Sequence, residues 1–130
     1  MSFLSALKQF LPTTFGPADV EVLRAAQPRT VLLDVREPDE FAEGHIAGSV
    51  LLPMGKVSHH AATIAEAGVP IVVVCRSGAR ASASAGTLRQ AGAEVVHVLA
   101  GGVLAWAREG HPLETGSRSP ALLAALKGRR

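Results

Sequence analysis

The 130-residue sequence has one cysteine, one tryptophan and no tyrosine. A lone cysteine cannot form a disulfide within the chain, which favours a reducing compartment, so we expect a cytoplasmic location. No apolar run is long enough to span a bilayer, and the first residues, with Lys8 among them, do not resemble a signal peptide. Hydrophobic residues make up 48% of the chain and charged residues 18%, a composition that excludes intrinsic disorder. The chain is therefore expected to fold as one domain without covalent cross-links.

Charge is also scarce, with a net value of +2, and it is unevenly placed. Residues 1–115 hold nine basic and eleven acidic side chains, whereas residues 116–130 hold four basic and no acidic ones. A slightly acidic body lacks the basic face of nucleic-acid-binding domains, so no nucleic-acid partner is expected. The sequence predicts an N-terminal amphipathic appendage over 1–14, a domain over 15–115 and a basic C-terminal tail over 116–130.

Short apolar runs alternate with helix-like segments along the chain. Runs of β-branched and aliphatic residues without polar alternation are typical of strands buried on both faces. They predict strands over residues 31–34, 49–52, 71–74 and 95–98. Proline or acidic starts and glycine ends predict helices over 17–26, 38–43, 58–67, 78–91 and 103–109. Strands separated by such helices indicate an α/β fold, with a parallel sheet covered by helices on both faces.

A cysteine follows the most apolar of these strands. Cys75 comes directly after residues 71–74 and precedes a short loop that leads into a helix. The loop residues are Arg76, Ser77, Gly78, Ala79 and Arg80. Unpaired N–H groups at the helix start, the helix dipole and two guanidinium groups all favour a thiolate over a thiol. A buried structural cysteine is the alternative, but the charged, glycine-containing loop favours a reactive one, which requires a sulfur that solvent can reach.

Three motifs resemble the rhodanese-like domain in order and spacing. They are the Cys75 loop, residues 32–53 (LLDVREPDEFAEGHIAGSVLLP) and residues 101–114 (GGVLAWAREGHPLE). The resemblance covers about residues 17–114 and implies a single domain whose central parallel sheet has about five strands. It also implies a sulfurtransferase, in which Cys75 takes up a sulfane sulfur as a persulfide and residues 76–80 bind the substrate.

The second motif supplies candidate supporting residues around this loop. Asp34 and Arg36 follow a predicted strand, so they should lie at the same sheet edge as Cys75. By the resemblance they help to frame the site, and Glu40 and His45 belong to the same signature. Arg36 could pair with Glu40, four residues further on, or with Asp34. For Asp34, Glu40 and His45, a structural ion-pair cluster is favoured over a direct part in catalysis.

These features predict an enzyme that moves sulfur from a small anionic donor, thiosulfate or a persulfide, to cyanide or a thiol. Because the chain has no second cysteine, the acceptor must be an external thiol or a protein. No cofactor is implied, and the adjacent His59 and His60 do not predict a metal site, since no carboxylate or cysteine lies near them in sequence.

Two other functions remain open. One is a persulfide carrier or interaction module without turnover. The other is a phosphatase or arsenate reductase of the same fold. Four residues separate Cys75 from Arg80, which matches the shorter loop associated with sulfur transfer rather than the longer loop of the related dual-specificity phosphatases.

Overall fold

The structure is a computed structural model that describes residues 14–128, and it contains one parallel sheet of five strands in the order β1-β5-β4-β2-β3. The strands are β1 (Thr14–Phe15), β2 (Val31–Asp34), β3 (Val50–Leu51), β4 (Ile71–Val74) and β5 (Val96–Leu99). This arrangement confirms the predicted α/β class. Strand β1 falls at the boundary of the predicted N-terminal appendage, and the rest of that appendage lies outside the described residues.

Six helices connect or flank the strands in the described part of the chain. They are α2 (Pro17–Ala26), α3 (Pro38–Glu43), α4 (Met54–Ala67), α5 (Ala79–Gln90), α6 (Gly102–Arg108) and α7 (Leu122–Leu126). None of these helices is long and apolar enough to cross a membrane. The bounds of α2 and α3 agree with those predicted, because proline at the first helical position and acidic first turns mark their starts.

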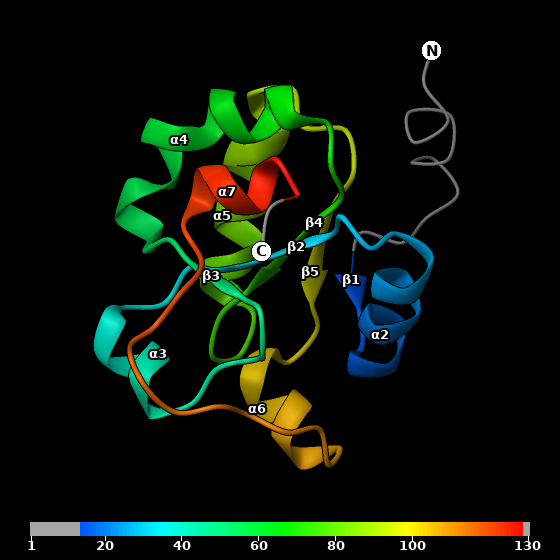
Figure 1. Ribbon diagram of the computed structural model, residues 1–130, viewed down its shortest axis with the longest axis vertical. Coiled ribbons are helices and arrows are strands. Elements are labelled where there is room, and N and C mark those ends of the chain that lie inside the picture. Colours follow the sequence, from blue (N-terminus) through cyan, green and yellow to red (C-terminus); the bar gives the residue numbers. More distant parts are fainter. Residues whose placement is uncertain (1–13, 129–130) are drawn as a thin grey trace.

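The helices form a layer on each face of the sheet. Helices α4, α5 and α7 pack on one face, and α2 and α6 pack on the other (Figure 1). Successive side chains of a strand point to opposite faces. Val73 of β4 therefore packs in the core beneath α4 and α5, whereas Val72 packs with Trp106 of α6. The central strand is buried on both faces, as its unbroken apolar run predicted.

The segment after the third motif packs along the β3 edge of the sheet. Glu114 pairs with His45 through two backbone hydrogen bonds of 2.8 Å, and the hydroxyl of Ser119 accepts a hydrogen bond from the Leu51 amide at 2.9 Å. Helix α7 follows, and its Leu126 is only 4% exposed because it enters the core on the α4 side. The sequence assigned Ser119 and Leu126 to a separate basic tail over 116–130 and did not predict α7.

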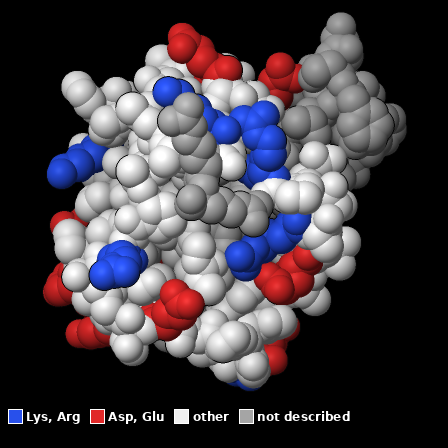
Figure 2. All heavy atoms as spheres, in the orientation of Figure 1, with Lys and Arg blue, Asp and Glu red and all other residues white. Residues whose placement is uncertain are grey.

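Charged side chains of both signs occupy the surface. On the face shown in Figure 2, several basic groups gather in the upper half, while acidic groups lie mostly toward the rim and the lower half, with wide uncharged areas between them.

Candidate active site

Cys75 lies at the carboxyl end of the middle strand. Strand β4 pairs with β2 on one side and with β5 on the other, and all three strands run in the same direction. Their carboxyl ends therefore meet at one edge of the sheet, where Asp34 ends β2 and Gly101 follows β5 closely. This edge is the usual location of binding sites in open α/β sheets. The predicted convergence of Asp34 and Cys75 at this edge is present.

The Cys75 sulfur accepts hydrogen bonds from the loop backbone. The N–H of Gly78 donates to Sγ at 3.0 Å, and the N–H of Ala81 donates at 3.4 Å. The loop reaches this geometry through a φ of 126° at Gly78, in the region that only glycine adopts readily. Amide donors aimed at one atom favour negative charge on that atom. The loop can therefore hold an anion at the sulfur.

Ala81 was not among the predicted site residues. It is the third residue of α5, and the first turn of any helix has amide groups without partners inside the helix. Because α5 begins at Ala79, the Ala81 amide is one of these unpartnered groups, and the same rule would have identified it as a donor to the sulfur. Arg76, Ser77 and Ala79 are exposed on the outer side of the loop.

The sulfur is more buried than the sequence led us to expect. Cys75 is 1% exposed, and its side chain lies in the same buried cluster as Ala81. The predicted solvent-accessible sulfur is therefore not found, because almost none of Cys75 reaches the surface.

Helix α6 fixes the backbone of Cys75 from the other side. The N–H of Val103 donates to the Cys75 carbonyl at 3.0 Å, and the N–H of Leu104 donates to the Arg76 carbonyl at 3.2 Å. The approach is so close that a Cβ on Gly102 would overlap both carbonyl oxygens. The glycine pair of the third motif thus lets α6 dock directly on the cysteine loop.

Arg80 is paired with a carboxylate from a neighbouring helix. Its Nη1 and Nη2 donate to the two carboxylate oxygens of Glu40 in α3 at 2.7 and 2.8 Å. The hydrogen bonds with Arg80 lower the pKa of Glu40 from 4.5 to about 2, an effect that partial burial opposes. The same pairing raises the pKa of Arg80, and negative charge at Cys75 and Asp34 adds to that rise. Arg80 is thus within electrostatic range of the sulfur, with its charge balanced by Glu40.

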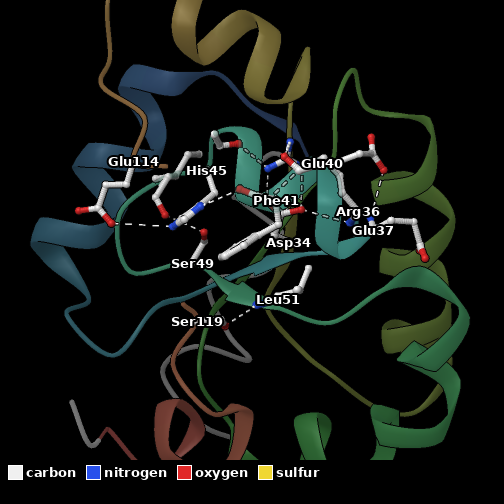
Figure 3. A network of polar contacts seen from close by, with 12 residues as sticks. Asp34, Arg36, Glu37, Glu40, Phe41, His45, Ser49, Leu51, Glu114 and Ser119 are labelled. Carbon is white, nitrogen blue, oxygen red and sulfur yellow. Dashed lines mark hydrogen bonds and ion pairs between the residues drawn. The ribbon is translucent and has the colours of Figure 1, made fainter. Parts of the chain in front are cut away.

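Arg36 is paired in turn with Asp34. Its Nε and Nη2 donate to the Asp34 carboxylate at 3.0 and 2.8 Å, and both side chains are buried (Figure 3). Its Nη1 and Nη2 also donate to the carbonyls of Glu40 and Gly44 at 3.1 and 2.9 Å. Of the two pairings that the sequence allowed for Arg36, the structure contains the one with Asp34. Arg36 binds Glu40 only through its backbone, which ties α3 to the end of β2.

His45 makes its contacts away from the loop residues. Its ring stacks on Phe41 at 3.8 Å between centroids, and Nδ1 lies 2.8 Å from the Phe41 carbonyl. Its Nε2 lies 3.8 Å from the carboxylate of Glu114 (Figure 3). These contacts join α3 to the C-terminal segment and agree with a structural part for His45. Within residues 14–128, no group of three or more histidine, cysteine and acidic side chains is arranged to hold a metal ion.

The structure is thus an α/β protein with a parallel five-stranded sheet and a cysteine at its carboxyl edge, where two backbone amides of a short loop donate to the sulfur. The model of the rhodanese-like domain matches residues 18–109, and the chain belongs to that family. The predicted family is therefore confirmed.

Individual relatives agree with this assignment. The rhodanese-like domain of the Anabaena protein Alr3790 superposes with a TM-score of 0.71 at 30% identity, over 85% of this chain and 86% of that one. A Rhodopseudomonas palustris protein of unknown function, described as a candidate tyrosine phosphatase, superposes with a TM-score of 0.70 at 25% identity, over 85% and 91% of the two chains.

One curated protein with a similar sequence carries the name of an enzyme. A candidate mitochondrial thiosulfate sulfurtransferase of Schizosaccharomyces pombe is 40% identical over 67 residues, which cover 42% of this chain and 47% of the relative. The chain thus spans about half the length of this curated relative. Family membership supports sulfurtransferase chemistry in general.

Proposed function

We propose that the protein is a sulfurtransferase in which Cys75 carries a sulfane sulfur from an anionic donor to an external acceptor. One observation carries the proposal: the Gly78 and Ala81 amides both donate to Sγ at the sheet edge. Amides that favour a thiolate also favour the persulfide anion that replaces it. The name of the Schizosaccharomyces pombe relative supports thiosulfate as one donor.

The reaction proceeds in two displacements at sulfur. The Cys75 thiolate attacks the outer sulfur of thiosulfate, a new S–S bond forms, and sulfite leaves with the electrons of the broken S–S bond. Cyanide or an external thiolate then attacks the outer persulfide sulfur, and the Cys75 thiolate is released. Each step moves one neutral sulfur atom and exchanges no electrons with an outside oxidant or reductant, so neither step requires a redox cofactor. The chain has one cysteine, so the acceptor comes from outside, as a small thiol or a protein.

The free thiol also suggests where the reaction takes place. Free thiols, including a thiol acceptor, persist best in a reducing compartment, and the only cysteine of the chain is unpaired. We therefore assign the activity to the cytoplasm. Detection of the protein only in an oxidising compartment would contradict that assignment.

The direct test is thiosulfate-to-cyanide sulfur transfer by the wild type and by the Cys75→Ser variant. Loss of the nucleophile should lower the rate by more than about a thousandfold. A Ser82→Ala variant is the matched control, because Ser82 is exposed in α5 and lies outside the loop of residues 76–80. Wild-type turnover by Cys75→Ser would overturn the proposal.

Phosphate-ester hydrolysis is the second candidate function. The Rhodopseudomonas palustris neighbour, described as a candidate tyrosine phosphatase, favours it, and an amide-lined loop can hold a phosphate as well as a persulfide. The four-residue spacing between Cys75 and Arg80 favours the smaller sulfur substrate. Cys75-dependent hydrolysis of p-nitrophenyl phosphate, together with no sulfur transfer, would select the phosphatase instead.

A further inference from the structure

The charges around Cys75 nearly cancel. Three guanidinium groups lie on the elements that form the site, but two of them are held by carboxylates. Arg36 is paired with Asp34, and Arg80 is paired through both nitrogens with Glu40. Arg76 is left as the exposed cation of the loop. A sequence count of the loop gives two positive charges, whereas the ion pairs reduce the effective charge of the site to about one.

The pairing of Arg80 with Glu40 determines how much of the positive charge of Arg80 acts at the sulfur. Arg80 is the second residue of α5, between the two amides that contact Sγ, and it interacts electrostatically with the sulfur. Glu40 reaches it from α3, forty residues away in sequence, and belongs to no part of the loop itself. Both side chains of the pair are roughly a third exposed, so an incoming donor meets the pair at the surface of the site.

We infer that Glu40 makes the site selective for singly charged sulfur donors over doubly charged ones. The inference rests on the proposed sulfur transfer and names the donor class: an alkyl persulfide or a thiosulfonate, each with one negative charge, is preferred to thiosulfate, which has two. A dianion gains twice as much as a monoanion from each uncompensated positive charge nearby. By neutralising Arg80, Glu40 removes the advantage that a second cation would give to the dianion.

Two donors that react in the same way but differ in net charge can show the effect of donor charge alone. Thiosulfate and methanethiosulfonate both present a terminal sulfur on a sulfonyl group, and they differ by one negative charge. In each case the Cys75 thiolate bonds to the outer sulfur and the S–S bond of the donor breaks. Sulfite leaves from thiosulfate, and methanesulfinate leaves from methanethiosulfonate, each with the bonding electrons. Comparing each variant with wild type cancels the intrinsic reactivity of the two donors.

The experiment measures kcat/KM for both donors with cyanide as the acceptor. In Glu40→Gln the carboxylate charge is lost and Arg80 becomes uncompensated. The thiosulfate value should rise roughly tenfold and the methanethiosulfonate value roughly threefold, so the ratio shifts about threefold toward thiosulfate. The shift should appear mainly in KM and should fade at high salt, because ions screen an exposed charge.

Two further variants separate this effect from a structural role of the pair. Arg80→Gln leaves Glu40 unpaired and should move the ratio in the opposite direction. The double variant Glu40→Gln with Arg80→Gln restores the wild-type net charge and should restore the wild-type ratio. Asp39→Asn removes an exposed carboxylate from the same helix without releasing Arg80, and should leave the ratio nearly unchanged.

The outcomes test the selectivity for singly charged donors separately from the proposed sulfur transfer. An unchanged ratio in Glu40→Gln, or an equal shift in Asp39→Asn, would overturn the selectivity inference while leaving sulfur transfer intact. Failure of the wild type to take sulfur from either donor would overturn the proposed function itself. If Glu40→Gln does not fold, the opposite shift expected in Arg80→Gln still decides the question.

Discussion

Replacement of Gly102 by alanine tests whether α6 holds the cysteine loop in place. Gly102 has a φ of 59°, and an added Cβ would overlap the carbonyl oxygens of Cys75 and Arg76. A left-handed φ costs about 1 kcal/mol for a residue with a Cβ. Displacement of packed backbone adds roughly 1–3 kcal/mol. Gly102→Ala should therefore lower the free energy of unfolding by about 2–4 kcal/mol.

The same substitution should also damage sulfur transfer. To relieve the overlap, the carbonyls of Cys75 and Arg76 must move, and the hydrogen bonds from Val103 and Leu104 to them must lengthen. The amides that face Sγ belong to the same loop. A displacement near 1 Å at a reacting group can cost about a hundredfold in rate. We expect kcat to fall by roughly ten- to a hundredfold, measured by thiosulfate-to-cyanide transfer on protein that is still folded.

Gly110→Ala is the control for backbone strain alone. Gly110 has a φ of 85°, but nothing lies within 4 Å of the Cβ it would acquire. This variant should lose about 1 kcal/mol in urea unfolding and keep wild-type kcat. Equal loss of stability in the two variants, with kcat preserved in Gly102→Ala, would refute the reasoning.

Two further predictions concern stability. The pKa of Glu40 is lowered from 4.5 to about 2, so the ion pair with Arg80 stabilises the fold above pH 4.5 and is lost as the pH falls toward 2. After allowance for solvent screening, the free energy of unfolding of wild type should exceed that of Glu40→Gln by about 1 kcal/mol at neutral pH, and the excess should shrink between these pH values. A pH-independent difference would contradict this. Leu126→Ala should cost about 2–3 kcal/mol because Leu126 is buried, whereas Leu123→Ala in the same helix, 57% exposed, should cost less than about 0.5 kcal/mol. Equal effects in thermal unfolding would show that α7 is not part of the core.

Local sequence patterns were sufficient for strands β2, β3, β4 and β5 and for most of the helices. The unbroken apolar run of β4 and the proline starts of α2 and α3 carry strong local signals. Helix α4 begins at Met54, four residues before its predicted start, because Val57 continues the buried face that Ala61 and Ile64 define. Gly55 lies in that first turn, and because glycine has a low helix propensity, the sequence did not indicate a helix there.

Features that depend on contacts between residues far apart in the chain could not be predicted from the sequence. Strand β1 has two residues and is ordered by pairing with β5. Helix α7 has five residues, too few to be stable alone, and is held by burial of Leu126. The pairing of Arg80 with Glu40 joins residues forty positions apart. No spacing rule predicts such a contact, so the cationic loop looked more positive in sequence than it is in the fold.

The burial of Cys75 is the other feature that required the structure. The sequence identified the strand end, the loop and the helix start, and these are the elements that meet at Sγ. It could not indicate that Cys75 would be 1% exposed, because that depends on how the cysteine packs in the core beside α5. Chemical access to Cys75 is thus set by tertiary packing.

Intact-mass spectrometry after brief exposure to thiosulfate tests most directly whether Cys75 carries sulfur. The wild-type protein should gain the mass of one sulfur atom and lose it again on addition of cyanide, while Cys75→Ser should gain nothing. An unchanged mass of the wild type, in a folded sample whose Cys75 also resists alkylation, would contradict the account by showing that the sulfur is an inert part of the core.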